Sequence, residues 1–155
     1  MLDALVFPVL LATAAAGQPT VPELLPLRER PAAENAILAD RLENLLPALM
    51  AEAELDMWLV LSREYAEDPV YFTLVPQPTF AARRTTLLVF HRKDDGSVER
   101  LVVNRYPLGG PYEAAWQGGD LEAQWQALGE LIVARNPGRI GINVSRDLAI
   151  ADGLS

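Results

Sequence analysis

Arginine side chains gather at the predicted ends of β-strands, where α/β domains commonly place binding residues. The group, which two tyrosines accompany, consists of Arg63, Arg83, Arg84 and Arg105, with Tyr65 and Tyr106. Guanidinium groups bind carboxylates through paired N–H donors, so this group could hold a carboxylate of a ligand or of a partner subunit. Loop arginines that only face solvent are the alternative, and the sequence favours neither.

Two acidic residues in the same stretch, Glu64 and Asp68, allow a second interpretation. Neighbouring carboxyl groups can act as a general acid and a general base. We favour a structural alternative in which Asp68 caps a short helical turn and Glu64 pairs with Arg63 or Arg84. His91 is the only histidine, and its place at the end of a β-rich run indicates a surface or half-buried residue rather than a catalytic base.

The composition excludes several kinds of site and partner. The 155 residues contain no cysteine, which excludes disulfides, thiolate zinc sites and a cysteine nucleophile. The formal net charge of −8 argues against a nucleic-acid partner, because binding phosphate backbones requires a clustered cationic surface. The glycines do not have phosphate-loop spacing, and carboxylates do not converge from several predicted strands as a two-metal site requires. We therefore predict no cofactor and no metal ligand in this chain.

The first 31 residues divide into two segments of different composition. Residues 4–16 are largely apolar and end in small residues, which predicts a cleaved export signal over residues 1–17, although Asp3 stands where a basic residue is usual. The alternatives are an apolar N-terminal helix of the fold and a start codon assigned too late. Residues 18–31 contain four prolines and are typical of an extended linker. A periplasmic or secreted protein, without membrane attachment after cleavage, is the expectation.

Residues 32–155 predict an α/β domain with a mixed β-sheet flanked by helices. A helix follows the linker, and Pro47 should kink or split it. Its predicted buried stripe consists of Ile37, Leu38, Leu42, Leu45, Leu46 and Leu49. The continuous apolar run at residues 57–61 predicts a strand that is covered on both faces.

The second half of the domain carries the clearest local signals. An Asp-Asp-Gly-Ser turn at residues 94–97 predicts an antiparallel hairpin between the runs at 85–91 and 98–106. Asp120 is the expected N-cap of a helix that reaches residue 135. The buried stripe of that helix should consist of Leu121, Trp125, Leu128, Leu131 and Ile132. Residues 139–144 then predict a last, buried strand.

Several short segments, in this order and spacing, resemble one protein family. They are LPALM at 46–50, DMWLV at 56–60, REY at 63–65, DPV at 68–70, RRTT at 83–86, IGINVS at 140–145 and ADGLS at 151–155. Together they are similar to the N-terminal domain of exported bacterial M24 metallopeptidases, the family of Xaa-Pro aminopeptidases, prolidases and creatinase. The likeness covers residues 31–155.

The resemblance implies a creatinase-type, ribonuclease-H-like fold that carries no catalytic metal ligand. In this family a following domain holds two divalent metal ions through two Asp, one His and two Glu, and the expectation is that this chain stops before that domain. The N-terminal domain then contributes to a homodimer and helps to cover the active site of the catalytic domain. Residues suited to such an interface or gating role are Arg63, Glu64, Tyr65, Asp68, Arg83 and Arg84. The alternative is a free-standing module that binds a small carboxylated ligand through these arginines and tyrosines.

Overall fold

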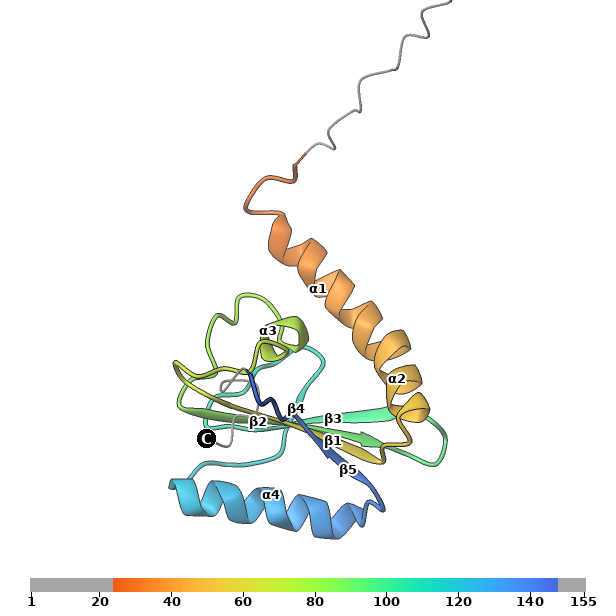
Figure 1. Cartoon of the computed structure of the whole chain (residues 1–155). Coiled ribbons are helices and arrows are strands. Elements are labelled where there is room, and N and C mark those ends of the chain that lie inside the picture. Colours follow the sequence, from red (N-terminus) through yellow and green to blue (C-terminus); the bar gives the residue numbers. More distant parts are fainter. Residues whose placement is uncertain (1–23, 148–155) are drawn as a thin grey trace, which may run out of the picture.

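A five-stranded mixed sheet with helices on both faces is built by residues 24–147, the part of the chain that the computed structural model describes (Figure 1). The strands lie in the order β4-β3-β2-β1-β5. Their bounds are β1 (Met57–Arg63), β2 (Thr85–Arg92), β3 (Val98–Val103), β4 (Glu113–Ala114) and β5 (Ile140–Ile142). The predicted α/β class with a mixed sheet is confirmed, because β2 runs antiparallel to β1 and β3, whereas β5 and β4 run parallel to their neighbours. The predicted export signal and the motif at 151–155 lie outside the described residues.

The three central strands are apolar on both faces because each face is covered by a helical layer. Side chains alternate along β1, so that Val60 packs toward the N-terminal helix while Leu59 and Leu61 pack toward the C-terminal helix. The predicted hairpin is confirmed, with Arg92 opposite Val98 across the turn. Gly96 in that turn has a φ of +83°, a conformation that glycine adopts without steric cost.

A long helical segment covers one face of the sheet. It runs through α1 (Arg30–Asp40), a π-helical turn (Arg41–Leu45) and α2 (Leu46–Glu52). Pro47 cannot donate a backbone hydrogen bond, and just before it the N–H of Leu46 bonds to the carbonyl of Arg41, five residues back. The predicted interruption at Pro47 is therefore confirmed, in the form of a π-turn.

The buried stripe of this helical segment is narrower than the predicted one. Its members recur every four residues, at Leu38, Leu42, Leu46 and Met50. The prediction was wrong for three residues that remain 48–59% exposed, namely Ile37, Leu45 and Leu49. A helix that contacts a sheet along one row of side chains leaves the adjacent row in solvent. The predicted short turn after Asp68 is also present, as α3 (Tyr71–Leu74) on the same face.

The opposite face of the sheet is covered by α4 (Leu121–Arg135). Asp120 is its N-cap as predicted, since the carboxylate accepts a hydrogen bond from the N–H of Ala123 at 2.8 Å. The helix ends at Asn136, which adopts the left-handed conformation. Leu128 is buried, and Trp125, Leu131 and Ile132 pack around it as expected. The prediction was wrong for Leu121, which lies in the first turn and is 56% exposed.

The last strand is shorter and more exposed than predicted. β5 pairs with β1 over three residues, at the margin of the described sheet. The predicted strand is confirmed over Ile140–Ile142. Its expected burial is wrong, because Ile140, Ile142 and Val144 are 40%, 47% and 73% exposed. A strand with one neighbour has less of its surface covered than a central strand does. The two-residue β4, which was not predicted, closes the other margin beside β3.

Candidate functional site: an arginine cluster at one end of the sheet

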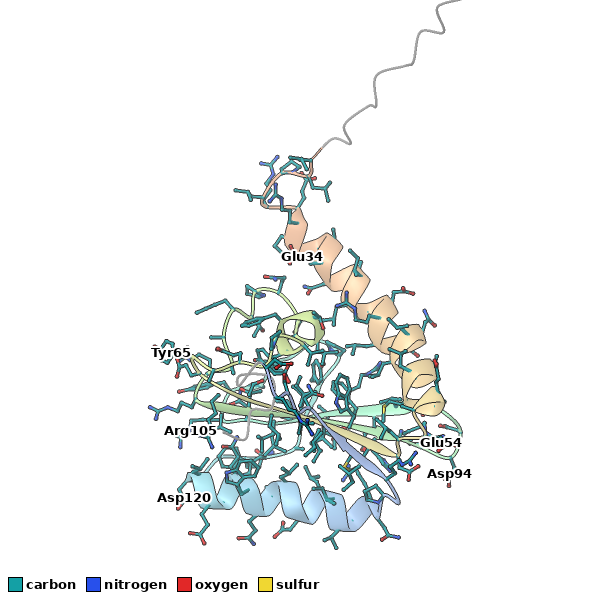
Figure 2. All side chains as sticks on the ribbon, in the orientation of Figure 1. Glu34, Glu54, Tyr65, Asp94, Arg105 and Asp120 are labelled. Atoms are coloured by element: carbon teal, nitrogen blue, oxygen red, sulfur yellow. The ribbon has the colours of Figure 1, made fainter. Side chains whose placement is uncertain are left out.

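Antiparallel pairing brings the four predicted arginines to the same end of the sheet. Arg63 is the last residue of β1 and pairs with Thr85, the first residue of β2, which directly follows Arg84. Leu87 of β2 pairs with Val103, the last residue of β3, which places Arg105 just beyond the same end. We call Arg63, Arg83, Arg84 and Arg105 the arginine cluster. Figure 2 shows Arg105, Tyr65 and the α4 N-cap Asp120 at this end, while Glu54 and Asp94 lie at the opposite end.

An unusual backbone presents these side chains to solvent. Tyr65, Arg83 and Arg84 have positive φ angles of 69°, 41° and 63°. Such angles are uncommon outside glycine, and they concentrate at sites where the surrounding structure enforces them. Here Glu64 holds the two loops together, because its N–H donates to the carbonyl of Arg84 at 2.6 Å and its carboxylate accepts from the N–H of Arg84 at 3.1 Å. Tyr65 is 93% exposed as a result.

The arginine cluster is not neutralised within residues 24–147. No member of the cluster forms an ion pair in this part of the chain. Arg83 lies over the ring of Tyr106, with its Cζ atom 4.9 Å from the ring centroid, and Arg105 donates from Nη2 to the carbonyl of Gly119 at 2.7 Å. Other arginines differ, since Arg92 and Arg135 each have a carboxylate partner. The cluster is therefore a local cationic surface on an acidic chain.

The acidic residues beside the cluster are bonded to the backbone instead. Glu64 binds the N–H of Arg84, Glu67 accepts from the N–H of Ala82 at 3.1 Å, and Asp120 caps α4. The expected ion pair of Glu64 with Arg63 or Arg84 is therefore wrong. The Glu64 carboxylate binds the main-chain N–H of Arg84 rather than a guanidinium group. These carboxylates fix the loops and leave the arginine side chains available for another anion.

Asp68 has a structural environment that is separate from the cluster. The side chain is 4% exposed, and its Oδ1 accepts from the N–H of Val70 at 2.9 Å, which forms a turn just before α3. The predicted helix cap at Asp68 is wrong, because Val70 is the N-cap and no described side chain caps this helix. Its Oδ2 accepts from Asn143 at 2.6 Å, and Asn143 in turn accepts from the indole N–H of Trp58 at 2.9 Å. Glu64 shares no hydrogen bond with Asp68 in this network. The arrangement links β1, α3 and the segment after β5.

A cavity of about 350 Å³ opens between the cluster and the first turn of α4. Polar and aromatic side chains line it, including Arg84, Asn104, Arg105, Trp116, Asp120 and Gln124. Asn104 and Gln124 were not singled out from the sequence, since an uncharged amide in an apolar segment gives no chemical signal. Both are nearly fully buried, at 4% and 5% exposure. The cavity combines cationic donors with amide and carboxylate acceptors, which suits a small polar ligand.

His91 takes the half-buried position at a strand end that was predicted. Its Nδ1 atom lies 3.5 Å from Oε2 of Glu99. The Glu99 carboxylate also accepts two hydrogen bonds from Arg135, one on each oxygen. The Arg135 guanidinium lowers the pKa of the Glu99 carboxyl group below its usual range. Within the described ranges, no three side chains from His, Asp and Glu come together in a way that could hold a metal ion.

Two further results concern membrane spans and similarity to known proteins. Among the helices of residues 24–147, none has both the length and the apolar content needed to cross a bilayer. Comparison of the chain with protein-family models, with curated proteins and with solved structures found no match.

Proposed function

We propose that the chain is the non-catalytic N-terminal domain of an exported M24-type Xaa-Pro peptidase. In this proposal it has the creatinase-type fold, forms a homodimer, and helps to cover the active site of a following catalytic domain. That domain would hold the two divalent metal ions. The ordered motifs support the proposal, together with a five-stranded mixed sheet that has helices on both faces.

The observation that carries the proposed role is the arginine cluster without carboxylate partners in residues 24–147. Two motifs of the resemblance, REY at 63–65 and RRTT at 83–86, lie at this end of the sheet. Peptide substrates and products carry a free carboxylate, which guanidinium groups bind well. Arg63, Tyr65 and Arg84 are therefore the residues proposed to face the active site, and Glu64 with Asp68 would hold their loops in place.

Three experiments test this proposal. Sequencing the DNA downstream of codon 155 should reveal two Asp, one His and two Glu in a catalytic domain, and a stop codon at once would contradict the proposal. The 155-residue chain alone, supplied with Mn²⁺ or Co²⁺, should not hydrolyse an Xaa-Pro dipeptide. Robust turnover by this chain would show that it carries its own catalytic centre. Sedimentation equilibrium measures whether the chain is the expected homodimer.

A second candidate function is a free-standing module that binds a small carboxylated ligand. The cavity beside Arg84 and Arg105 favours it, because the site is complete within one chain. Carboxylates should raise the melting temperature, and Arg84→Ala should reduce that rise, because it removes a guanidinium group that lines the cavity. The absence of stabilisation by every carboxylate tested would exclude this candidate and leave the peptidase proposal standing.

A further inference from the structure

Two arginine side chains that form few other hydrogen bonds supply donor groups to the cavity beside α4. Arg84 lines the cavity, and its guanidinium group makes no hydrogen bond to residues 24–147. Arg105 lines it too and uses one of its N–H groups on the carbonyl of Gly119. The N-terminal end of α4, a helix of 15 residues, adds a favourable dipole for an anion. These two guanidinium groups and the helix N-terminus suit a carboxylate ligand.

Acceptor groups line the same cavity. Asn104 donates from Nδ2 to the hydroxyl of Thr86 at 2.9 Å, and its buried Oδ1 has no hydrogen-bond partner among the described residues. Gln124 donates from Nε2 to the carbonyls of Thr85 and Val103, both at 2.9 Å, which fixes the orientation of its amide. Asp120 adds a carboxylate, of which Oδ1 caps α4. Buried polar atoms normally have partners, so the Oδ1 atom of Asn104 indicates a ligand that brings an N–H donor, and Asp120 and Gln124 offer further oxygen acceptors.

An aromatic side chain supplies the apolar wall. Trp116 lines the cavity, and Gly119 allows its ring to lie close, because a Cβ atom on Gly119 would be 3.3 Å from Cζ2 of the ring. The same Cβ would be 3.0 Å from that of Ala123, a tight contact, so glycine favours the close approach of the loop to α4. Leu121 adds an exposed apolar side chain at the cavity mouth. An apolar group on the ligand would contact these two side chains.

We propose that this cavity binds a small zwitterion, a free amino acid or dipeptide with an apolar side chain. Arg84 and Arg105 bind its carboxylate, Asp120 and the amide oxygen of Gln124 receive its ammonium group, and Trp116 contacts its side chain. The volume of about 350 Å³ lies at the lower end of the range for small-molecule sites. The inference rests on the second candidate function, which it sharpens, and it does not depend on the peptidase relationship.

The test uses three ligands that differ by one charge. Free leucine, N-acetyl-leucine, which lacks the ammonium group, and leucinamide, which lacks the carboxylate, are titrated into the 155-residue chain up to about 10 mM, a range that detects weak binding. Leucine should bind at least about tenfold more tightly than either analogue, the loss expected when a charge-assisted pair is removed. Its binding should shift the backbone amide resonances of Gly119 and Leu121.

Two cationic residues at opposite ends of the sheet provide a pair of variants. Arg84→Gln should weaken leucine binding at least about tenfold, whereas Lys93→Gln removes the same charge far from the cavity and should leave affinity unchanged within about twofold. Lys93 is exposed, directly follows the last residue of β2 and does not line this cavity. Circular dichroism confirms that both variants are folded before titration.

Each contrary outcome has a definite meaning. The lack of leucine binding up to about 10 mM would overturn the inference. Equal binding of leucine and N-acetyl-leucine would show that the ammonium group is not recognised. It would overturn the proposal of a zwitterionic ligand and leave the carboxylate-binding candidate standing. Equal losses in Lys93→Gln and Arg84→Gln would overturn the assignment to this cavity, because they would show a general effect of charge.

Discussion

A row of buried polar side chains crosses the sheet just inside the arginine cluster. Ser62 of β1 pairs directly with Thr86 of β2, and Asn104 follows the end of β3. The hydroxyl of Thr86 donates to the carbonyl of Ala82 and accepts from Asn104, so it forms two hydrogen bonds. The Ser62 hydroxyl is buried and has no partner in residues 24–147. The Thr86 hydroxyl should therefore stabilise the fold, whereas the Ser62 hydroxyl should lower its stability.

Substitution of these two hydroxyl residues should separate the two effects. Ser62→Ala should leave the free energy of unfolding unchanged or raise it by up to about 1 kcal/mol, because it removes a buried group that lacks a hydrogen bond. Thr86→Val should lower the free energy of unfolding by about 1–3 kcal/mol, because it leaves the Ala82 carbonyl and the Asn104 amide without their partner. Urea denaturation measures both. A large loss in Ser62→Ala would show that its hydroxyl is bonded after all.

The Glu99 carboxylate predicts how stability depends on acid pH. Hydrogen bonds from Arg135, at 2.5 and 2.8 Å, lower its pKa in the folded chain. A lowered folded-state pKa gives stability that is present above the unfolded-state pKa and is lost as the pH falls through the folded-state value. Arg135→Gln should therefore move the midpoint of acid unfolding to a higher pH, which circular dichroism measures. Arg139→Gln is the control, since its partner Glu54 is 80% exposed, and an equal shift in both variants would contradict the assignment.

At the scale of elements, a single carboxylate fastens β5 to the rest of the sheet. β5 forms only three residue pairs with β1. At the entrance to β5, Oδ2 of Asp56 accepts from the N–H groups of Gly138 and Arg139, both at 2.9 Å. Its Oδ1 lies 3.2 Å from Arg92 on the neighbouring strand. Asp56 thus connects three segments at the end of the sheet opposite the arginine cluster.

Removal of this carboxylate should loosen β5 before it unfolds the domain. Asp56→Ala should lower the free energy of unfolding by about 1–3 kcal/mol, because two main-chain donors and Arg92 lose their acceptor. Hydrogen exchange of the amides in Ile140–Ile142 should accelerate more than exchange in β2. Glu54→Ala is the matched control, since it removes only an exposed ion pair with Arg139 and should cost less than about 1 kcal/mol. Equal effects of both substitutions would refute the anchoring role.

Elements with local signals were predictable from the sequence. The turn at residues 94–97 and the cap at Asp120 specify their own hydrogen bonds, and the hairpin and α4 follow from them. Exposure in β5 and in the row of Ile37, Leu45 and Leu49 was not predictable, because it depends on which neighbour each face meets. Hydrophobic residues alone do not identify their partner.

The candidate site was predictable in its charges but not in its contacts. Arginines at strand ends are visible in a sequence once the strands are placed, and antiparallel pairing then brings them together. The bond between Glu64 and the N–H of Arg84 depends on the positive φ angles of Arg83 and Arg84, which the residue types disfavour. The buried amides of Asn104 and Gln124 acquire their meaning only from the cavity that they line.

At the scale of the whole molecule, residues 24–147 form two apolar layers, one on each side of the sheet. The layer beneath α4 consists of aliphatic side chains and Met57, and the partly buried Trp116 and Trp125 pack against it. The layer beneath α1 and α2 contains two buried tyrosines, Tyr71 and Tyr112. Their hydroxyl groups donate to the carbonyls of Ala81 at 3.2 Å and Leu74 at 2.6 Å. Ionisation of either tyrosine would place a negative charge in this layer, so its integrity depends on both remaining protonated.

Alkaline unfolding should therefore report on this layer. Burial raises the pKa of Tyr71 from 10.0 to about 12, and burial also raises the pKa of Tyr112. A raised folded-state pKa gives stability that is fully present below the unfolded-state value of 10.0 and is lost as the pH rises through about 12. The chain contains four tyrosines and one lysine, so few other side chains titrate between about pH 9 and 12.

Phenylalanine variants test this expectation by thermal melts from about pH 8 to 12, the range in which tyrosine ionises. Tyr71→Phe and Tyr112→Phe should each be less stable than the parent near neutral pH, because a hydrogen bond to a carbonyl is lost. Each should also lose less stability above pH 10, since one buried ionisation has been removed. Tyr65→Phe, at a position 93% exposed, should follow the parent curve. Alkaline curves for the two buried variants that run parallel to the parent would show that these tyrosines do not ionise before the layer opens.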